Sequence, residues 1–540
     1  MVSLCLTTKQ FHVITVRQLY RTVSLDVGGP SDTRLAAFLN PRNIGLEWIR
    51  NIELYRAEVV DKCQSQMQAA GFAVRMIIEF LPENILEKFN WHNQTFSAEN
   101  LVLLYRKQKK MKGVVAISLD DTLTDELKKR LDLDSIVENT TKLGLYPEDR
   151  NGLEFCHELL KRLKKADNLT LKLHGVFDED DSSLPARMLN DSSTEPGLVT
   201  KTIFAHMLPF NKCTPMVLRE LTLQKVHVRY ASETYCKVID FSKLKSLRVF
   251  SCSGADALFA ELSKSARLPD KLETLDFKHE DQIRESDLMD ALDGFLCLVS
   301  GIQRLTIDIS YTKSLPGTSS IIRHSKTLRL LNIHAINGDP TDSDEEEHVY
   351  TAIDFAKILN SCILLEQLSL AFPPTVITRD YSDDYNLYMT LLLSMLPKLT
   401  TLNITTWPTN QPITSRLPRK KYEHLLQGMA QSGFESRLLN ATRPTPSRLS
   451  VIAWGTSDKI FERENAAKNT IIFVKGKQID PFGKEAPLAV SVGWCARKFV
   501  EPTSEVLDFE LMRTVRPPTR ETVVGDEEFN VGWGAQGDDH

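Results

Sequence analysis

The chain has 540 residues, of which 42% are hydrophobic and 25% charged, and its net charge is -5. This composition is typical of a soluble globular protein and gives no indication of a nucleic-acid partner. No run of 18 apolar residues occurs, and the first ten residues lack the basic start and apolar core of a signal peptide. We therefore expect an intracellular protein, cytoplasmic or nuclear, without a membrane partner.

The cysteines predict no metal centre and no disulfide framework. There are nine, an odd number, and they form no Cys-x-x-Cys pair. Reduced, buried thiols are the expected state.

At the N-terminus, residues 3–25 predict a short helical segment that leads into a strand. They resemble the closing third of an F-box, and Leu19-Tyr-Arg-Thr-Val23 resembles the segment that joins the F-box to the repeats in fungal F-box proteins. The Leu-Pro-x-Glu helix that opens an F-box has no counterpart here, so the N-terminal half of the motif is missing. The resemblance implies contact with a Skp-type adaptor through the apolar side chains of this segment, which are Leu4, Leu6, Phe11, Ile14 and Leu19.

The next segment, residues 34–54, resembles the first repeat of the same proteins. Its residues predict a helix through Phe38 that stops before Pro41, because the residue before a proline disfavours helical backbone. A strand with Ile49, Ile52 and Leu54 follows.

One phrase of three apolar residues then recurs along the chain, as in Leu244-Lys-Ser-Leu247-Arg-Val249 and Leu272-Glu-Thr-Leu275-Asp-Phe277. Its last four residues alternate apolar and polar, which is typical of a strand with one buried face. The intervals have helical spacing, for example Leu288, Leu292 and Phe295. The phrases begin at residues 49, 86, 114, 140, 166, 218, 244, 272, 302, 328, 365, 399 and 449.

A strand and a helix repeated at a near-constant period predict an α/β solenoid similar to leucine-rich repeats, a horseshoe of short parallel strands and helices. We expect four regions: a partial F-box-like segment (1–25), the solenoid (26–410), a C-terminal cap with a strand hairpin (411–515) and a disordered tail (516–540). The hairpin is expected over residues 470–494 and has a Pro and Gly turn.

Polar residues between the apolar strand positions are expected to line the concave face and to bind a protein partner: Thr222, Arg248, Asp276, Thr306, Asn332, Ser369 and Asn403, flanked by Gln224, Lys278, Asp308 and His334. For any single one of them, a merely solvated strand residue is the simpler interpretation.

Enzyme motifs are not apparent. Residues 114–124 are similar to the strand end of haloacid-dehalogenase-type phosphotransferases, but Ser118 stands where the nucleophilic aspartate is required. There is no phosphate-binding loop, no dinucleotide fingerprint and no His-Glu-x-x-His motif. We expect no catalytic residue, no cofactor and no metal ligand.

The resulting hypothesis is a non-enzymatic recognition protein. Its resemblance to fungal F-box proteins implies the role of substrate receptor in an SCF-type ubiquitin ligase. The alternative is a leucine-rich-repeat scaffold with no ubiquitin-ligase role, and an enzyme is the third possibility.

Overall fold

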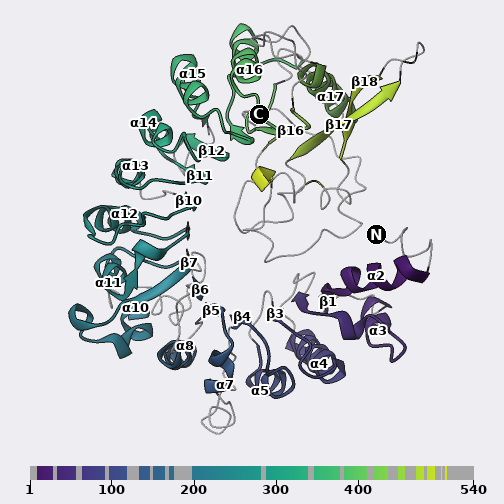
Figure 1. Cartoon of the computed structure of the whole chain (residues 1–540), viewed down its shortest axis with the longest axis vertical. Helices are drawn as coiled ribbons and strands as arrows, with labels where there is room; N and C mark the ends of the chain where they lie inside the picture. The colour runs from purple at the N-terminus through teal and green to yellow at the C-terminus, as the bar shows by residue number, and fades with distance from the viewer. Residues whose placement is uncertain are drawn as a thin grey trace, which may run out of the picture. The chain divides into compact units, whose positions relative to one another are not determined.

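A short strand followed by a helix is the unit from which this α/β chain is built (Figure 1). The computed structural model describes residues 9–27, 33–55, 64–91, 96–117, 133–145, 147, 150–163, 169–174, 198–280, 287–337, 346–377, 382–409, 419–435, 448–455, 470–479, 483, 485–492, 500 and 505–507. Two compact units divide the described chain: residues 9–244 with 252–261, and residues 245–251 with 262–507.

The first unit contains a parallel sheet whose strands follow the order of the sequence. Its strands are β1 (Thr22–Asp26), β2 (Asn51–Tyr55), β3 (Lys88–Trp91), β4 (Gly113–Ile117), β5 (Lys142–Leu145), β6 (Leu169–His174), β7 (Met216–Gln224) and the short β8 (Ile239–Asp240) beside β7. Its helices are α2 (Lys9–Tyr20), α3 (Thr33–Phe38), α4 (Gln64–Phe80), α5 (Ala98–Lys107), α7 (Leu133–Glu138), α8 (Arg150–Arg162), α10 (Leu198–Ile203), α11 (Ser232–Val238) and most of α12 (Ala255–Lys264). Short 3-10 turns are η1 (Leu46–Trp48), η2 (Ala205–Met207), η3 (Phe210–Lys212) and η4 (Phe241–Lys243).

The second unit has the same plan and adds an antiparallel end. Its strands are β9 (Ser246–Phe250), β10 (Thr274–Glu280), β11 (Arg304–Ser310), β12 (Leu330–Asn337), β13 (Glu346–Glu347), β14 (Gln367–Leu370), β15 (Thr401–Ile404), β16 (Val451–Trp454), β17 (Ile471–Ile479) and β18 (Glu485–Ser491). Its helices are α13 (Leu288–Leu298), α14 (Thr318–Ile322), α15 (Ala352–Ser361), α16 (Asp383–Met395) and α17 (Arg419–Glu435), followed by the 3-10 turn η6 (Glu505–Leu507).

A repeated backbone contact fixes the register of neighbouring strands. The carbonyl after the first apolar residue of a phrase accepts from two successive amides of the next repeat. The carbonyl of Lys245 accepts from Glu273 and Thr274 at 2.8 and 3.0 Å, and that of Glu273 accepts from Gln303 and Arg304 at the same distances. Where strand starts are bonded in this way, the apolar positions of successive repeats meet side by side.

The apolar phrase residues form the core between strands and helices. Leu247, Leu275, Leu305, Leu331 and Leu368 are partners in successive strands, and none has measurable exposure. Because side chains alternate along a strand, the polar residues between them face the other side of the sheet. In Figure 1, helices α13–α16 lie along one side of the second unit's strands.

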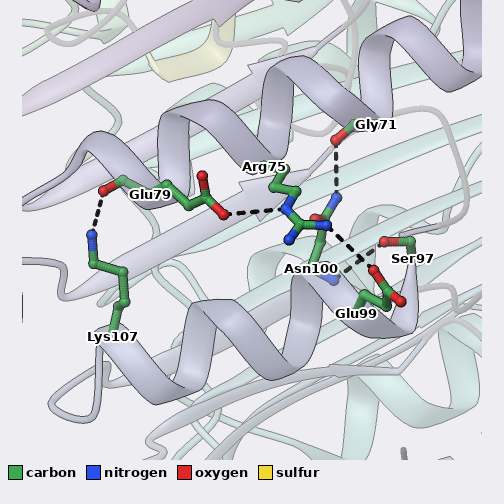
Figure 2. Close-up of polar contacts among 7 residues, drawn as sticks. All are labelled: Gly71, Arg75, Glu79, Ser97, Glu99, Asn100 and Lys107. Atoms are coloured by element: carbon green, nitrogen blue, oxygen red, sulfur yellow. Dashed lines mark hydrogen bonds and ion pairs between the residues drawn. The ribbon is translucent and has the colours of Figure 1, made fainter.

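Helices of adjacent repeats are joined by specific side chains. In the first unit, the Arg75 guanidinium on α4 contacts Glu79 at 3.2 Å and Glu99 of α5 at 3.4 Å (Figure 2). The Asn100 side chain donates to the Gly71 carbonyl at 3.0 Å, and Lys107 reaches the Glu79 carbonyl from the other end of α5. In the second unit, the rings of Phe355 and Tyr388 stack with their centroids 4.6 Å apart, joining α15 to α16.

Two predicted phrases are displaced in register. The phrase predicted to begin at Val114 begins at Met111, because Val114 itself pairs with Phe89 and Leu143 and the Lys112 carbonyl makes the entry contact. In β6 the middle apolar position is Leu171 and not the predicted Leu169, because Leu171 pairs with Leu143 and Leu221. Both strands contain a register irregularity, which the sequence pattern does not reveal.

The C-terminal hairpin predicted over residues 470–494 is present. Strand β17 pairs antiparallel with β16 on one side and with β18 on the other. The predicted tail, residues 516–540, lies outside the described residues.

Candidate binding face of the second unit

Polar side chains of the second unit form one row across neighbouring strands. Arg248 pairs with Asp276, Asp276 with Thr306, and Thr306 with Asn332. The row continues from Asn332 to Ser369 and from Ser369 to Asn403. These six residues, here called the polar row, were predicted from the sequence to share a face, and the register places them together. Thr222 lies in the first unit, opposite Lys172.

At the start of the polar row, a buried carboxylate is matched by a partly exposed guanidinium. The side chain of Asp276 is 3% exposed and that of Arg248 is 29% exposed, with 3.1 Å between the paired atoms. A buried carboxylate without a counter-charge is strongly destabilising. The pair therefore holds β9 and β10 together and leaves one side of the guanidinium open to solvent.

Two residues further along the same strands, Lys278, Asp308 and His334 form a cluster, here called the charged triad. The Lys278 ammonium lies 2.8 Å from one oxygen of Asp308, and Nδ1 of His334 lies 2.8 Å from the other. The three side chains come from β10, β11 and β12 in direct register. Because β strands have a side-chain period of two, the triad lies on the same face as the polar row.

Contacts within the triad shift the pKa of Asp308 and the pKa of His334. Burial raises the pKa of the Asp308 carboxyl, but Lys278 and His334 outweigh burial and hold this pKa well below its usual range. Burial lowers the pKa of His334, but the hydrogen bond and charge of Asp308 reverse the direction and raise this pKa overall. Asp308 is therefore ionised at neutral pH and accepts from both neighbours.

Glu347 extends this charged region. It belongs to β13, which runs antiparallel to the end of β12, and its charge contributes to the raised pKa of His334. The Thr405 hydroxyl donates to Glu347 at 2.5 Å. Positive and negative groups alternate here at short distances, so the region offers donors and acceptors rather than a single sign of charge.

At its other end the polar row becomes buried and then apolar. The Asn403 side-chain amide donates to the Ser369 hydroxyl at 2.9 Å, and both residues are buried. The next position in register is Ala453. Val506 and Leu507 of η6 pack here with Leu330, Val451, Ala453 and Ile472, and the Val506 amide donates to Oε1 of Gln367 at 2.8 Å.

The face is thus divided into two parts. The charged part, on β9–β12, has partly exposed groups in Arg248, Asp308 and Asn332. The apolar part, from Leu330 to Ile472, is covered by the chain's own residues 505–507 (drawn in yellow beside β12 in Figure 1). Sequence reasoning missed this cover, because Val506 lies 139 residues from its partner Gln367 and no local pattern connects them.

The residues predicted to contact an adaptor are only partly described. Leu4 and Leu6 lie outside the described residues, while Phe11 and Ile14 belong to helix α2, for which only the backbone is described at these positions. Leu19, near the end of α2, is half-buried. The Arg17 guanidinium lies 4.1 Å from the ring centroid of Trp48, which fastens α2 to η1 by a cation–π contact.

Within the described ranges, no three His, Cys, Asp or Glu side chains gather as a metal ion requires. Nor does any helix in the described part of the chain have the length and apolarity needed to span a bilayer. The sequence matches no protein-family model, and no curated protein matches it.

Proposed function

We propose that this chain is a non-enzymatic, leucine-rich-repeat-like solenoid that recognises a protein partner through the polar row and charged triad of the second unit. The supporting observation is the register that brings Arg248, Asp276, Lys278, Asp308 and His334 onto one face. Their charges are mutually paired, which suits hydrogen bonding to a polar protein surface more than activation of a small substrate. Paired charges at a protein interface favour specificity and orientation.

A substitution at the centre of the row tests this proposal. Asn332 is uncharged and half-buried, so that Asn332→Lys alters the face without removing a member of a charge pair. Gln303→Lys is the matched control, because Gln303 is exposed and lies outside the row. The wild-type chain and the control should retain the same protein partner in quantitative affinity purification, while Asn332→Lys retains at least tenfold less. Equal retention by both variants would contradict the proposal.

We further propose, from the resemblance of residues 3–25 and 34–54 to fungal F-box proteins, that the partner is a substrate of an SCF-type ubiquitin ligase. In support, α2 is followed directly by β1, which pairs with β2 of the first repeat, so the order of elements agrees with a helical segment joined to repeats. Co-expression with a Skp-type adaptor tests this role for the chain as given and for a form extended upstream. Failure of both forms to co-purify with the adaptor would favour the scaffold alternative.

A further inference from the structure

Residues 505–507 cover an apolar surface that would otherwise be open on the proposed binding face. Its floor consists of Leu330 on β12, Val451 and Ala453 on β16, and Ile472 on β17, here called the apolar seat. Val506 is 6% and Leu507 1% exposed. The seat therefore accommodates two adjacent aliphatic side chains almost completely.

The described hydrogen bond to residues 505–507 is made to a backbone amide and not to a side chain. Gln367 accepts from the Val506 amide at 2.8 Å. Any residue other than proline supplies such an amide, so the contact fixes the position of a bound segment without selecting its sequence. Selectivity is left to the apolar seat, which is the division of roles seen when proteins bind short peptide segments.

The covering segment is a single short turn. Val506 and Leu507 pack on the seat, and the Val506 amide bonds to Gln367, while the entropy cost of ordering the chain opposes these contacts. Local opening of such a segment is expected to be easier than unfolding of the sheet below it. The seat also adjoins the polar row, because Ala453 follows Asn403 in register.

We propose that the apolar seat is a binding site for a polypeptide segment of the protein partner that carries two adjacent aliphatic residues, and that Val506 and Leu507 are its internal competitor. This inference rests on the proposed recognition function and specifies the chemistry of the partner. Displacement of residues 505–507 joins the apolar seat to the polar row, so that a partner contacts both.

A synthetic peptide tests the site directly. The probe is a fluorescein-labelled peptide of residues 500–513, Val-Glu-Pro-Thr-Ser-Glu-Val-Leu-Asp-Phe-Glu-Leu-Met-Arg, with a control peptide in which Val506 and Leu507 are both Asp. The full chain carrying Val506→Asp and Leu507→Asp should bind the probe at least tenfold more tightly than the wild-type chain in fluorescence anisotropy. The control peptide should bind neither protein.

Gln367→Leu in the same background should weaken probe binding about fivefold, which is the effect of one net hydrogen bond. Probe binding that is absent from both chains, or equal for both, would overturn the inference. Equal partner retention by Asn332→Lys and Gln303→Lys, with probe binding intact, would instead contradict the proposed function and leave the seat established. A wild-type chain that dimerises, and whose dimer is abolished by the two Asp substitutions, would assign the seat to a second copy and overturn the partner assignment.

If the double variant does not fold, amide hydrogen exchange of the wild-type chain tests whether residues 505–507 open independently of the sheet. The Val506 amide should exchange at least tenfold faster than the amides of β14, because residues 505–507 open without unfolding of the sheet. Exchange of Val506 only together with β14 would show that the segment is a permanent part of the core and would overturn the inference.

Discussion

Two buried histidines of the second unit experience opposite environments. His334 donates to the Asp308 carboxylate through Nδ1, and the carboxylate raises the pKa of its ring above the usual value. His324, after α14, is 1% exposed, and burial lowers the pKa of its ring to about 4, against a smaller opposing effect of the Leu296 carbonyl. The two histidines therefore change the free energy of unfolding with pH in opposite directions. The stabilisation from His334 is fully present below its unfolded pKa and is lost as the pH rises through its folded pKa.

For His324 the sign is reversed. Between pH 6.5 and about 4, the unfolded chain binds a proton at this position that the folded chain does not, so stability falls as the pH falls. We predict that His324→Gln reduces the loss of unfolding free energy between pH 7 and pH 5 by about 2 kcal/mol, measured by urea denaturation. His424, exposed on α17, provides the matched control. His424→Gln should leave the pH dependence of the unfolding free energy as it is in the wild-type chain. An unchanged pH dependence in His324→Gln would contradict the assignment of a buried neutral ring.

Leu275 tests the inward face of the strands. It has no measurable exposure and pairs with Leu247 and Leu305 on either side. Leu275→Asp places an unpaired carboxylate in this core, and we predict a loss of more than about 3 kcal/mol with a large fall in the melting temperature. Lys271→Asp, at an exposed position just before the strand, should change the melting temperature little. Equal melting of the two variants would mean that the inward face is assigned wrongly.

At the scale of elements, one side chain links two consecutive helices. Asp293 on α13 accepts from the Gly317 amide at 2.8 Å and from the Ser320 hydroxyl at 2.6 Å, both at the start of α14. Helix α14 has only five residues and depends on such contacts, because a short helix is not stable alone. The aspartate therefore acts as a cap supplied by the preceding repeat.

We predict that Asp293→Ala lowers the unfolding free energy by about 1–2 kcal/mol, the usual cost of removing a cap with a charged acceptor. Asp290→Ala on the same helix is the control, because Asp290 is exposed. Chemical denaturation of the two variants gives the comparison. If both variants unfold at the wild-type denaturant concentration, the contact between α13 and α14 contributes nothing to stability.

The repeated elements were predictable where the local pattern is regular. From residue 244 to 404, each phrase has its apolar positions at constant spacing, and the observed register agrees with it. The pattern failed at β4 and β6, where a strand irregularity changes which of several apolar residues meets its neighbour. Alternation alone fixes the face of a side chain but not its partner when apolar residues are adjacent, as in Val114-Val115.

The candidate site was predictable to the same extent. The polar row and its flanking charges follow from alternation, since every second residue of a strand shares a face. The pairing of Asp308 with both Lys278 and His334 requires the three-dimensional register of β10, β11 and β12. The contact of Val506 with Gln367 depends on a return of the chain that no periodicity encodes.

At the scale of the whole molecule, each unit repeats one strand-and-helix plan, and the second unit joins charged and apolar parts on one face. The proposed function uses the charged part for orientation, and the apolar seat inferred beside it adds burial of apolar surface. The proposed binding face depends on strand register, because register brings residues as distant in sequence as Arg248 and Ile472 onto one face.

The most direct test places a photo-activated cross-linking amino acid at position 332, in the middle of the polar row, and at position 303 as the exposed control outside it. The proposed function predicts that irradiation of the full chain in cell extract links a discrete protein partner to position 332 and not to position 303, and that an excess of unlabelled wild-type chain competes for it. Cross-links of equal yield and identity from both positions, or none from position 332, would contradict the assignment of this face to partner recognition.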